Sequence, residues 1–219
     1  MSAEHATREE HPWPAIAMHW VHLIALVVLI WTGFFIRSPF YAGSMQLNRS
    51  LHFIFMWLLI FTAVVRVYYA FVGFSAAPGM RRRIRDYRHF GPQRENRGKF
   101  FEQMKYYLFL RRTSPRHGKY NTLQKGTYIF WLILIAVQAI TGFAIWTTTQ
   151  RAFAPLTYAL GGPAAMRTYH YWIMWVFIVT VAVHIYLSAA EAWRELPLMF
   201  FGVETGEPAE KESRPATMG

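Results

Sequence analysis

The chain has 219 residues and a net charge of +11; 54% of it is hydrophobic and only 16% charged, a balance typical of a membrane protein. It contains no cysteine, which excludes thiolate-ligated iron–sulfur clusters, c-type haem attachment, catalytic thiols and disulfides. No P-loop, dinucleotide fingerprint or serine-hydrolase motif supports a soluble enzyme.

Four apolar stretches are each long enough to cross a bilayer as a helix, which takes about 20 residues. Each contains Trp or Tyr toward an end, as expected for side chains at the membrane–water interface. We expect an all-α fold, a bundle of four transmembrane helices within one membrane domain over residues 1–203. No cleavable signal peptide is expected, because acidic residues stand where a basic leader would lie. The predicted spans are residues 16–36, 51–72, 123–146 and 169–190.

The connection between the second and third spans is strongly basic. Residues 81–125 hold fourteen Lys and Arg against three acids, a balance that equals the charge of the whole chain. The positive-inside rule therefore places this loop and both termini in the cytoplasm. Nucleic-acid binding is not favoured, because the position of the loop between two spans already explains its charge. Apolar residues at helical spacing over residues 100–108, beside Lys105, Arg111 and Arg112, predict a short amphipathic helix on the inner leaflet, with a solvated linker as the alternative.

Two histidines of the fourth span, His170 and His184, are fourteen residues apart. On a helix this interval is just under four turns, so the rings share nearly one face and lie about 21 Å apart along the axis. That length is most of the hydrocarbon thickness of a bilayer. One helix could therefore supply an axial ligand to an iron near each membrane surface.

Each iron would need a second axial ligand from an earlier span. His52 lies at the start of the second span, and the first span offers His19 or His22, three residues apart on one face. With the N-terminus inside, the depths match for His52 with His170 near the outer surface. The same reasoning matches His184 with the first-span histidine near the inner surface. These pairs predict a cytochrome with two b-type haems, and two imidazoles on each iron leave no position for O₂.

Other residues lie at the depths of the two predicted irons. Gly33 and Gly142 each belong to a Thr-Gly-Phe sequence at the outer level, where a missing side chain gives room for a flat macrocycle; close helix packing is the alternative. Arg49 and Arg167 each precede an outer histidine by three positions and are candidate partners of haem propionates. Arg66 reaches the inner level as a third candidate, or extends to the membrane surface.

Several short motifs lie in or beside these spans. They are Met18-His19-Trp20, Thr32-Gly33-Phe34-Phe35-Ile36, Arg66-Val67-Tyr68-Tyr69-Ala70-Phe71-Val72-Gly73 and Tyr106-Tyr107-Leu108-Phe109-Leu110. With them, the chain from about Ala17 to Glu191 resembles the cytochrome b subunits of membrane-bound nickel–iron hydrogenases. It resembles more distantly the gamma subunit of respiratory formate dehydrogenase. The resemblance implies that His19, directly before the Trp, is the first-helix ligand.

One segment looks more like the formate dehydrogenase gamma subunit than like the hydrogenase form. It consists of Gly118-Lys119-Tyr120-Asn121 followed by Gln124-Lys125. In that family the matching Asn lies beside a quinone pocket next to the inner haem. The resemblance therefore implies Asn121, Gln124 and His184 as quinone contacts. Asn121 could equally be the N-cap of the third span.

The resemblance implies a subunit in the cytoplasmic membrane of a prokaryote, bound on its outer face to the iron–sulfur small subunit and the large catalytic subunit of a hydrogenase. Electrons would cross to menaquinone or ubiquinone near the cytoplasmic surface, while substrate oxidation would occur in the partner. A formate dehydrogenase or related molybdoenzyme is the alternative partner. A haem-free anchor would leave the depth-matched histidines without a role, and a transporter normally needs carboxylates or broken helices at the midplane. Residues 204–219 are polar and predicted to be a disordered tail.

Overall fold

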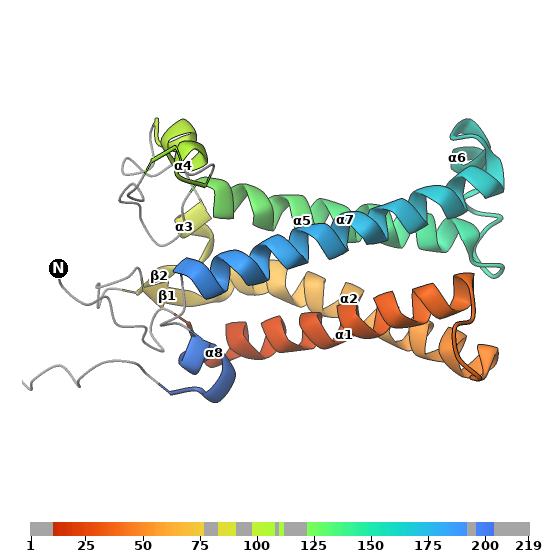
Figure 1. The fold of residues 1–219 in the computed structure, drawn as a ribbon, viewed down its shortest axis with the longest axis horizontal. Coiled ribbons are helices and arrows are strands. Elements are labelled where there is room, and N and C mark those ends of the chain that lie inside the picture. The colour runs from red at the N-terminus through yellow and green to blue at the C-terminus, as the bar shows by residue number, and fades with distance from the viewer. Residues whose placement is uncertain are drawn as a thin grey trace, which may run out of the picture.

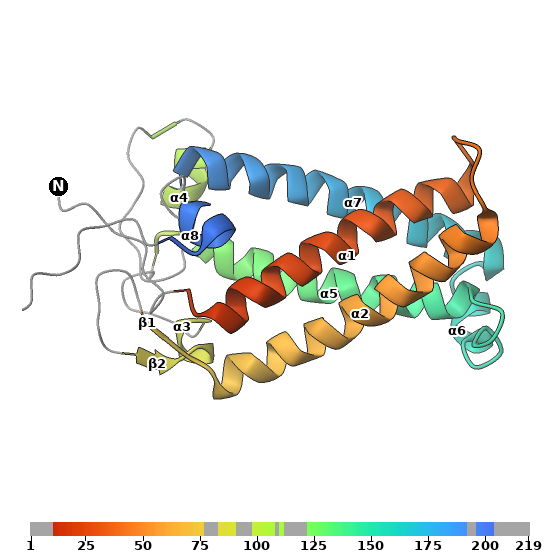
Figure 2. The same cartoon turned by 90° about the horizontal axis from the view of Figure 1, so that it is seen from below.

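The computed structural model describes residues 11–76, 83–90, 98–107, 110–111, 122–191 and 196–203. Four long helices lie side by side along one direction (Figures 1 and 2). Each is long and apolar enough to cross a membrane, so the predicted all-α fold with four spans is confirmed. The helices are α1 (Trp13–Arg37), α2 (Met45–Val72), α5 (Thr122–Ile145) and α7 (Gly162–Glu191).

Two of the helices begin well before the predicted apolar spans. α2 starts at Met45 and not at residue 51, because Ser44 caps it by accepting a hydrogen bond from the backbone N–H of Leu47 at 3.2 Å. α7 starts at Gly162 and not at residue 169. Hydropathy marks the part of a helix that lies in lipid, whereas caps and turns mark where the helical backbone begins.

The long helices pack as two pairs. α1 contacts α2 along its length and α5 contacts α7, while contacts between the two pairs are fewer. A short connection joins α1 to α2, and α6 (Ala154–Ala159) lies between α5 and α7 at one end of the bundle (Figure 1). Gly161 and Gly162 have φ angles of +99° and +88°, which lets the chain turn tightly into α7.

Large apolar side chains cover the outside of the bundle. Trp31, Trp57 and Trp172 are each more than half exposed, on three different helices. A surface this apolar suits contact with lipid, because acyl chains and not water then cover it.

The opposite end of the bundle, where α1 begins, carries the remaining elements (Figure 1). β1 (Phe74–Ala76) pairs antiparallel with β2 (Arg83–Arg85), a hairpin that the sequence analysis did not predict. α3 (Tyr87–Phe90) and α4 (Phe100–Tyr107) follow, and α8 (Leu196–Phe201) comes after α7. α4 coincides with the predicted amphipathic helix, whose position on the inner leaflet stays a prediction.

α8 packs against the start of α1. The indole N–H of Trp20 donates to the carbonyl oxygen of Met199 at 2.8 Å, and Ile16 and Leu198 are buried together beside it. The predicted disordered tail, residues 204–219, lies outside the described residues, so the domain boundary at residue 203 stays a prediction.

Candidate functional site

The four histidines predicted to bind iron face one another in two pairs. His52 on α2 faces His170 on α7 with ring centroids 6.4 Å apart, and His19 on α1 faces His184 on α7, also at 6.4 Å. His52 and His170 lie near the end of the bundle that holds α6, and are called the α6-end pair. His19 and His184 lie toward the other end and are called the α8-end pair. The partners are those expected from matching depths.

The separation of the rings suits one iron between two imidazoles. A bond from a metal to an imidazole nitrogen is about 2.0–2.1 Å long. The centre of a five-membered ring with bonds near 1.35 Å lies about 1.15 Å behind that nitrogen. Two such halves in line put the ring centroids about 6.4 Å apart, the value found in both pairs.

Each pair supplies two ligands, and an iron needs more. Within the described ranges, no group of three or more His, Asp or Glu side chains gathers at one point. A metal ion held by protein alone normally takes four or more ligands. A macrocycle that supplies four in-plane nitrogens would complete the coordination, so the donor set fits a haem better than a bare ion.

Threonine hydroxyls hold both rings of the α6-end pair. Thr32 Oγ1 on α1 lies 2.8 Å from His52 Nδ1, and Thr141 Oγ1 on α5 lies 2.9 Å from His170 Nδ1. Each hydroxyl donates its own hydrogen to the carbonyl four residues earlier in its helix, at 2.7 and 2.9 Å. It therefore accepts from Nδ1–H and leaves a lone pair on Nε2 of each ring, the atom that would bind a metal; in His170 this nitrogen lies 3.2 Å from the amide nitrogen of Gln138. Both threonines belong to the repeated Thr-Gly-Phe, and their role was not predicted from the sequence.

The glycines of the same repeat lie against the same rings. A Cβ at Gly142 would lie 3.3 Å from Cε1 of His170. A Cβ at Gly33 would lie 3.7 Å from Cε1 of His52 and 3.5 Å from the Met174 sulfur. Gly142 thus leaves room for the His170 ring, whereas a side chain at Gly33 would be in ordinary contact with His52. The predicted contact of these glycines with a macrocycle stays a prediction.

Gln138 on α5 is a polar neighbour that the sequence analysis missed. Its amide nitrogen lies 3.2 Å from Nε2 of His170 and 3.2 Å from the His170 carbonyl oxygen, to which it donates. An isolated amide inside a predicted span is costly without partners. That cost is the signal that could have identified this residue.

The α8-end pair has different surroundings. The ring of His184 lies edge-on to Trp131 of α5 at 5.2 Å, and the ring of His19 lies edge-on to Trp20 at 5.8 Å. Thr180 is the threonine one turn before His184, and it accepts from the Trp131 indole N–H at 3.1 Å. In the parts of the chain that the structure describes, neither His19 nor His184 has a hydroxyl or carbonyl hydrogen-bond partner.

The ring that faces His184 is that of His19 and not that of His22. His22 is partly buried, and its Nε2 has no hydrogen-bond partner among the described residues. His19 is thus the histidine of α1 whose ring contacts His184, and its role as the ligand, which the resemblance implies, stays a prediction.

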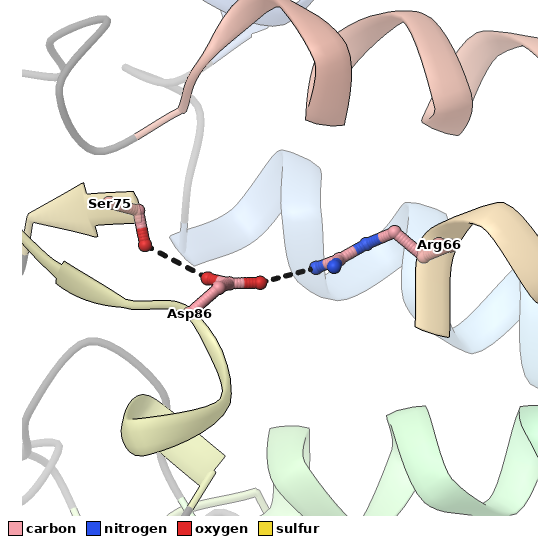
Figure 3. A network of polar contacts seen from close by, with 3 residues as sticks. All are labelled: Arg66, Ser75 and Asp86. Carbon is pink, nitrogen blue, oxygen red and sulfur yellow. Dashed lines mark hydrogen bonds and ion pairs between the residues drawn. The ribbon is translucent and has the colours of Figure 1, made fainter. Parts of the chain in front are cut away.

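The candidate propionate arginines lie in three different settings. Arg66 forms an ion pair with Asp86, whose Oδ2 lies 3.0 Å from the guanidinium, and Ser75 Oγ donates to the other carboxylate oxygen at 2.9 Å (Figure 3). This partner from the loop was not predicted from the sequence. Arg49 is exposed near the start of α2, and Arg167 is exposed beside a pocket of about 260 Å³ between α5, α6 and α7. Propionate contacts stay predictions for all three.

Of the predicted quinone contacts, the structure describes only the side chain of His184. Asn121 lies outside the described residues, and so does the side chain of Gln124. Their proposed contact with a quinone stays a prediction.

Comparison with known proteins gives one matching family and several relatives. The model of the family described as prokaryotic cytochrome b561 matches residues 10–202. A protein of Azotobacter vinelandii named "Probable Ni/Fe-hydrogenase B-type cytochrome subunit" is 29% identical over 195 residues, covering 81% of this chain and 78% of the relative. The protein of that name from Cupriavidus necator is 28% identical over 194 residues, covering 81% and 77%. A "Probable Ni/Fe-hydrogenase 1 B-type cytochrome subunit" of Escherichia coli is 24% identical over 197 residues, covering 81% and 80%. These matches confirm the predicted resemblance.

Proposed function

The chain belongs to the prokaryotic cytochrome b561 family, and on that premise we propose that it is the membrane subunit that carries electrons from a nickel–iron hydrogenase to quinone. His52 with His170, and His19 with His184, would each hold one b-type haem. The observation that carries this proposal is the ring separation of 6.4 Å in two imidazole pairs toward opposite ends of a four-span bundle.

When bound, the two haems would supply one-electron redox chemistry. The residues of the chain determine where that chemistry occurs. His170 and His184 lie on one helix about 21 Å apart along its axis, so they would hold the two haems at that spacing. With two imidazoles from the chain holding each haem, no position would remain for O₂, so each haem would serve electron transfer alone.

The direction of transfer follows from the proposed orientation. The basic loop and the termini would face the cytoplasm, so the α6 end would face outward and meet the iron–sulfur small subunit of the hydrogenase. The α8-end pair would lie close to a menaquinone or ubiquinone, with Asn121, Gln124 and His184 as the candidate contacts. Inward electron flow with proton uptake inside would contribute to a membrane potential. Because residues 118–125 resemble the formate dehydrogenase gamma subunit, a formate dehydrogenase is the second candidate partner.

The first prediction concerns the haem content of the purified full-length chain. A reduced-minus-oxidised spectrum should show b-type bands at about two haems per chain. His184→Ala removes one ligand of the α8-end pair and should lower the content to about one haem per chain. His22→Ala is the matched control, because His22 lies one turn from His19 on α1 but the ring in contact with His184 is that of His19; it should keep both haems.

The outcomes separate the proposal from its rivals. A wild-type chain without haem would make this protein a haem-free anchor or a transporter. Loss of haem in His22→Ala but not in His19→Ala would move the α1 ligand to His22. Unchanged haem content in His184→Ala would contradict the assignment of that residue.

A further inference from the structure

The two histidine pairs differ in how their unligated ring nitrogens are bonded. Both rings of the α6-end pair hydrogen-bond through Nδ1 to a threonine of the neighbouring helix, at 2.8 and 2.9 Å. We propose that Thr32 and Thr141 are positioning residues that hold the midpoint potential of the haem at this pair below that of the haem at the α8-end pair. The proposal rests on the proposed function, since it requires a haem at each pair.

The hydroxyls are held in a fixed acceptor role. Thr32 and Thr141 are 1% and 5% exposed, so water does not compete for them. The single hydrogen of each hydroxyl is donated to a carbonyl of its own helix, at 2.7 Å for Thr32 and 2.9 Å for Thr141. The remaining lone pairs accept the Nδ1–H of the facing ring. The direction of the hydrogen bond is therefore set by the helix backbone and does not depend on the redox state.

Accepting from Nδ1–H changes the ligand strength of the other ring nitrogen. An imidazole whose N–H is hydrogen-bonded carries more electron density at Nε2 and is a more basic ligand. A more basic ligand stabilises the oxidised, more positive iron over the reduced one, which lowers the midpoint potential. At the α6-end pair both axial ligands are affected in the same direction.

The α8-end pair lacks this effect in the described part of the chain. Thr180 has the same geometry as Thr32, since its hydroxyl donates to the carbonyl four residues earlier at 2.9 Å. Its acceptor position is taken by the indole N–H of Trp131 at 3.1 Å and not by His184. The ligand rings His19 and His184 contact aromatic rings in its place. The hydroxyl that would lower the potential is present at this pair but directed to another group.

The resulting order of potentials gives the electron path a direction. One electron at a time, supplied by the iron–sulfur clusters of the peripheral oxidoreductase, would pass from the lower-potential centre at the α6 end to the higher-potential centre at the α8 end. Quinone would then take up two electrons and two protons in two such passages. No bond to the ligand histidines forms or breaks in the transfer.

The test is a spectroscopic redox titration of the purified full-length chain with its haems bound. Wild type should show two midpoint potentials, and His184→Ala, which keeps the α6-end pair, should retain the lower one. Thr32→Val and Thr141→Val are each expected to raise the lower potential and leave the upper one in place, with a larger rise in the double variant. Thr62→Val is the matched control: the Thr62 hydroxyl donates at 2.8 Å to the carbonyl of Leu58 in α2, and no histidine contact is found for it among the described residues.

The conservative variant separates electronic from purely structural effects. Serine keeps the hydroxyl, so Thr32→Ser should titrate like wild type, whereas Thr32→Ala should titrate above it. If the valine variants lose the haem of the α6-end pair, the comparison of Thr32→Ser with Thr32→Ala still tests the effect of the hydroxyl on the potential. Unchanged potentials in haem-replete Thr32 and Thr141 variants, or an equal rise in Thr62→Val, would overturn this proposal alone. A wild-type chain without haem would overturn the proposed function and this inference together.

Discussion

The ring of His170 is held by side chains and backbone of α5 and not by its own helix. Thr141 accepts its Nδ1–H, Gly142 lies against its Cε1 edge, and Gln138 bonds its backbone carbonyl. A ligand held in this way keeps one orientation before a cofactor binds, which reduces the entropy lost on binding.

Gly142→Ala tests how little room this arrangement leaves. The added Cβ would lie 3.3 Å from the His170 ring, so the ring has to move by a few tenths of an ångström. We expect the chain to lose about 1–3 kcal/mol of stability, as in other over-packed cores, and to retain less haem at the α6-end pair. Thermal unfolding in detergent and haem content per chain measure the two effects.

Gly33→Ala is the control for that substitution. Its Cβ meets the nearest atoms at 3.5 and 3.7 Å, which is ordinary van der Waals contact, so haem content close to wild type is expected. Equal loss of haem in both variants would contradict this expectation and would instead favour the sequence-based prediction that both glycines face a macrocycle.

Sequence reasoning identified the histidines because an imidazole inside an apolar span is costly unless it has a function. It gave no role to Thr32 and Thr141, because a threonine inside a helix ordinarily bonds only its own backbone. That each threonine hydroxyl also accepts a hydrogen bond from a histidine of another helix is known only once the packing of the helices is known. The repeated Thr-Gly-Phe was the available signal, since each copy lies on the helix that packs beside a helix carrying a candidate ligand.

At the level of elements, the hairpin β1 and β2 is tied to the membrane helices by an ion pair. Arg66 of α2 is 28% exposed and Asp86, directly after β2, is 5% exposed, so the pair is largely shielded from water. Asp86 also accepts from Ser75 of β1, and its backbone N–H donates to the carbonyl of Gly73 at 2.9 Å. One carboxylate thus joins the end of α2 to both strands of the hairpin.

Asp86→Asn should loosen this connection. The amide keeps the shape of the side chain but leaves the guanidinium without its charge partner, which we expect to cost about 1–3 kcal/mol, less than for a fully buried pair because Arg66 is partly exposed. A lower unfolding temperature and faster trypsin cleavage after Arg83 and Arg85 would be the measured results.

Glu102→Gln supplies the comparison for this charge removal. Glu102 pairs with Arg111 at 2.7 Å, but both side chains are well exposed, at 51% and 40%. Its removal should leave unfolding and cleavage nearly unchanged, since water screens exposed pairs. Similar effects in the two variants would mean that the pair of Arg66 with Asp86 has no special structural role.

The hairpin could not be predicted from the sequence, because its strands have three residues each and one is mostly arginine. Propensity is weak over so short a segment, and tertiary contacts such as those of Asp86 decide its structure. Long apolar helices were predictable for the opposite reason, since lipid allows few alternatives to a helix over about 20 residues.

For the whole molecule, matching depths predicted that His52 faces His170 and that His184 faces a histidine of the first span, while the choice of His19 over His22 came from the resemblance. Helical rise fixes the height of each ring once the direction of each helix is known, and antiparallel neighbours follow from the connections. The depth of each histidine could not indicate that helix α1 packs mainly against α2 and helix α5 against α7. That choice depends on side-chain packing around the axis of each helix, which a linear pattern does not contain.

The orientation of the molecule can be tested directly because the chain has no cysteine, so any introduced thiol is unique. Ser38 is exposed between α1 and α2, and Lys105 is exposed on α4 at the other end of the bundle. The fourteen Lys and Arg of residues 81–125 should keep the Lys105 end in the cytoplasm. In right-side-out vesicles, a membrane-impermeant maleimide should label Ser38→Cys at once and Lys105→Cys only after permeabilisation, with the cysteine-free parent unlabelled. The reverse pattern would place the α6-end pair on the cytoplasmic side, and the proposed docking face and quinone site would then exchange sides.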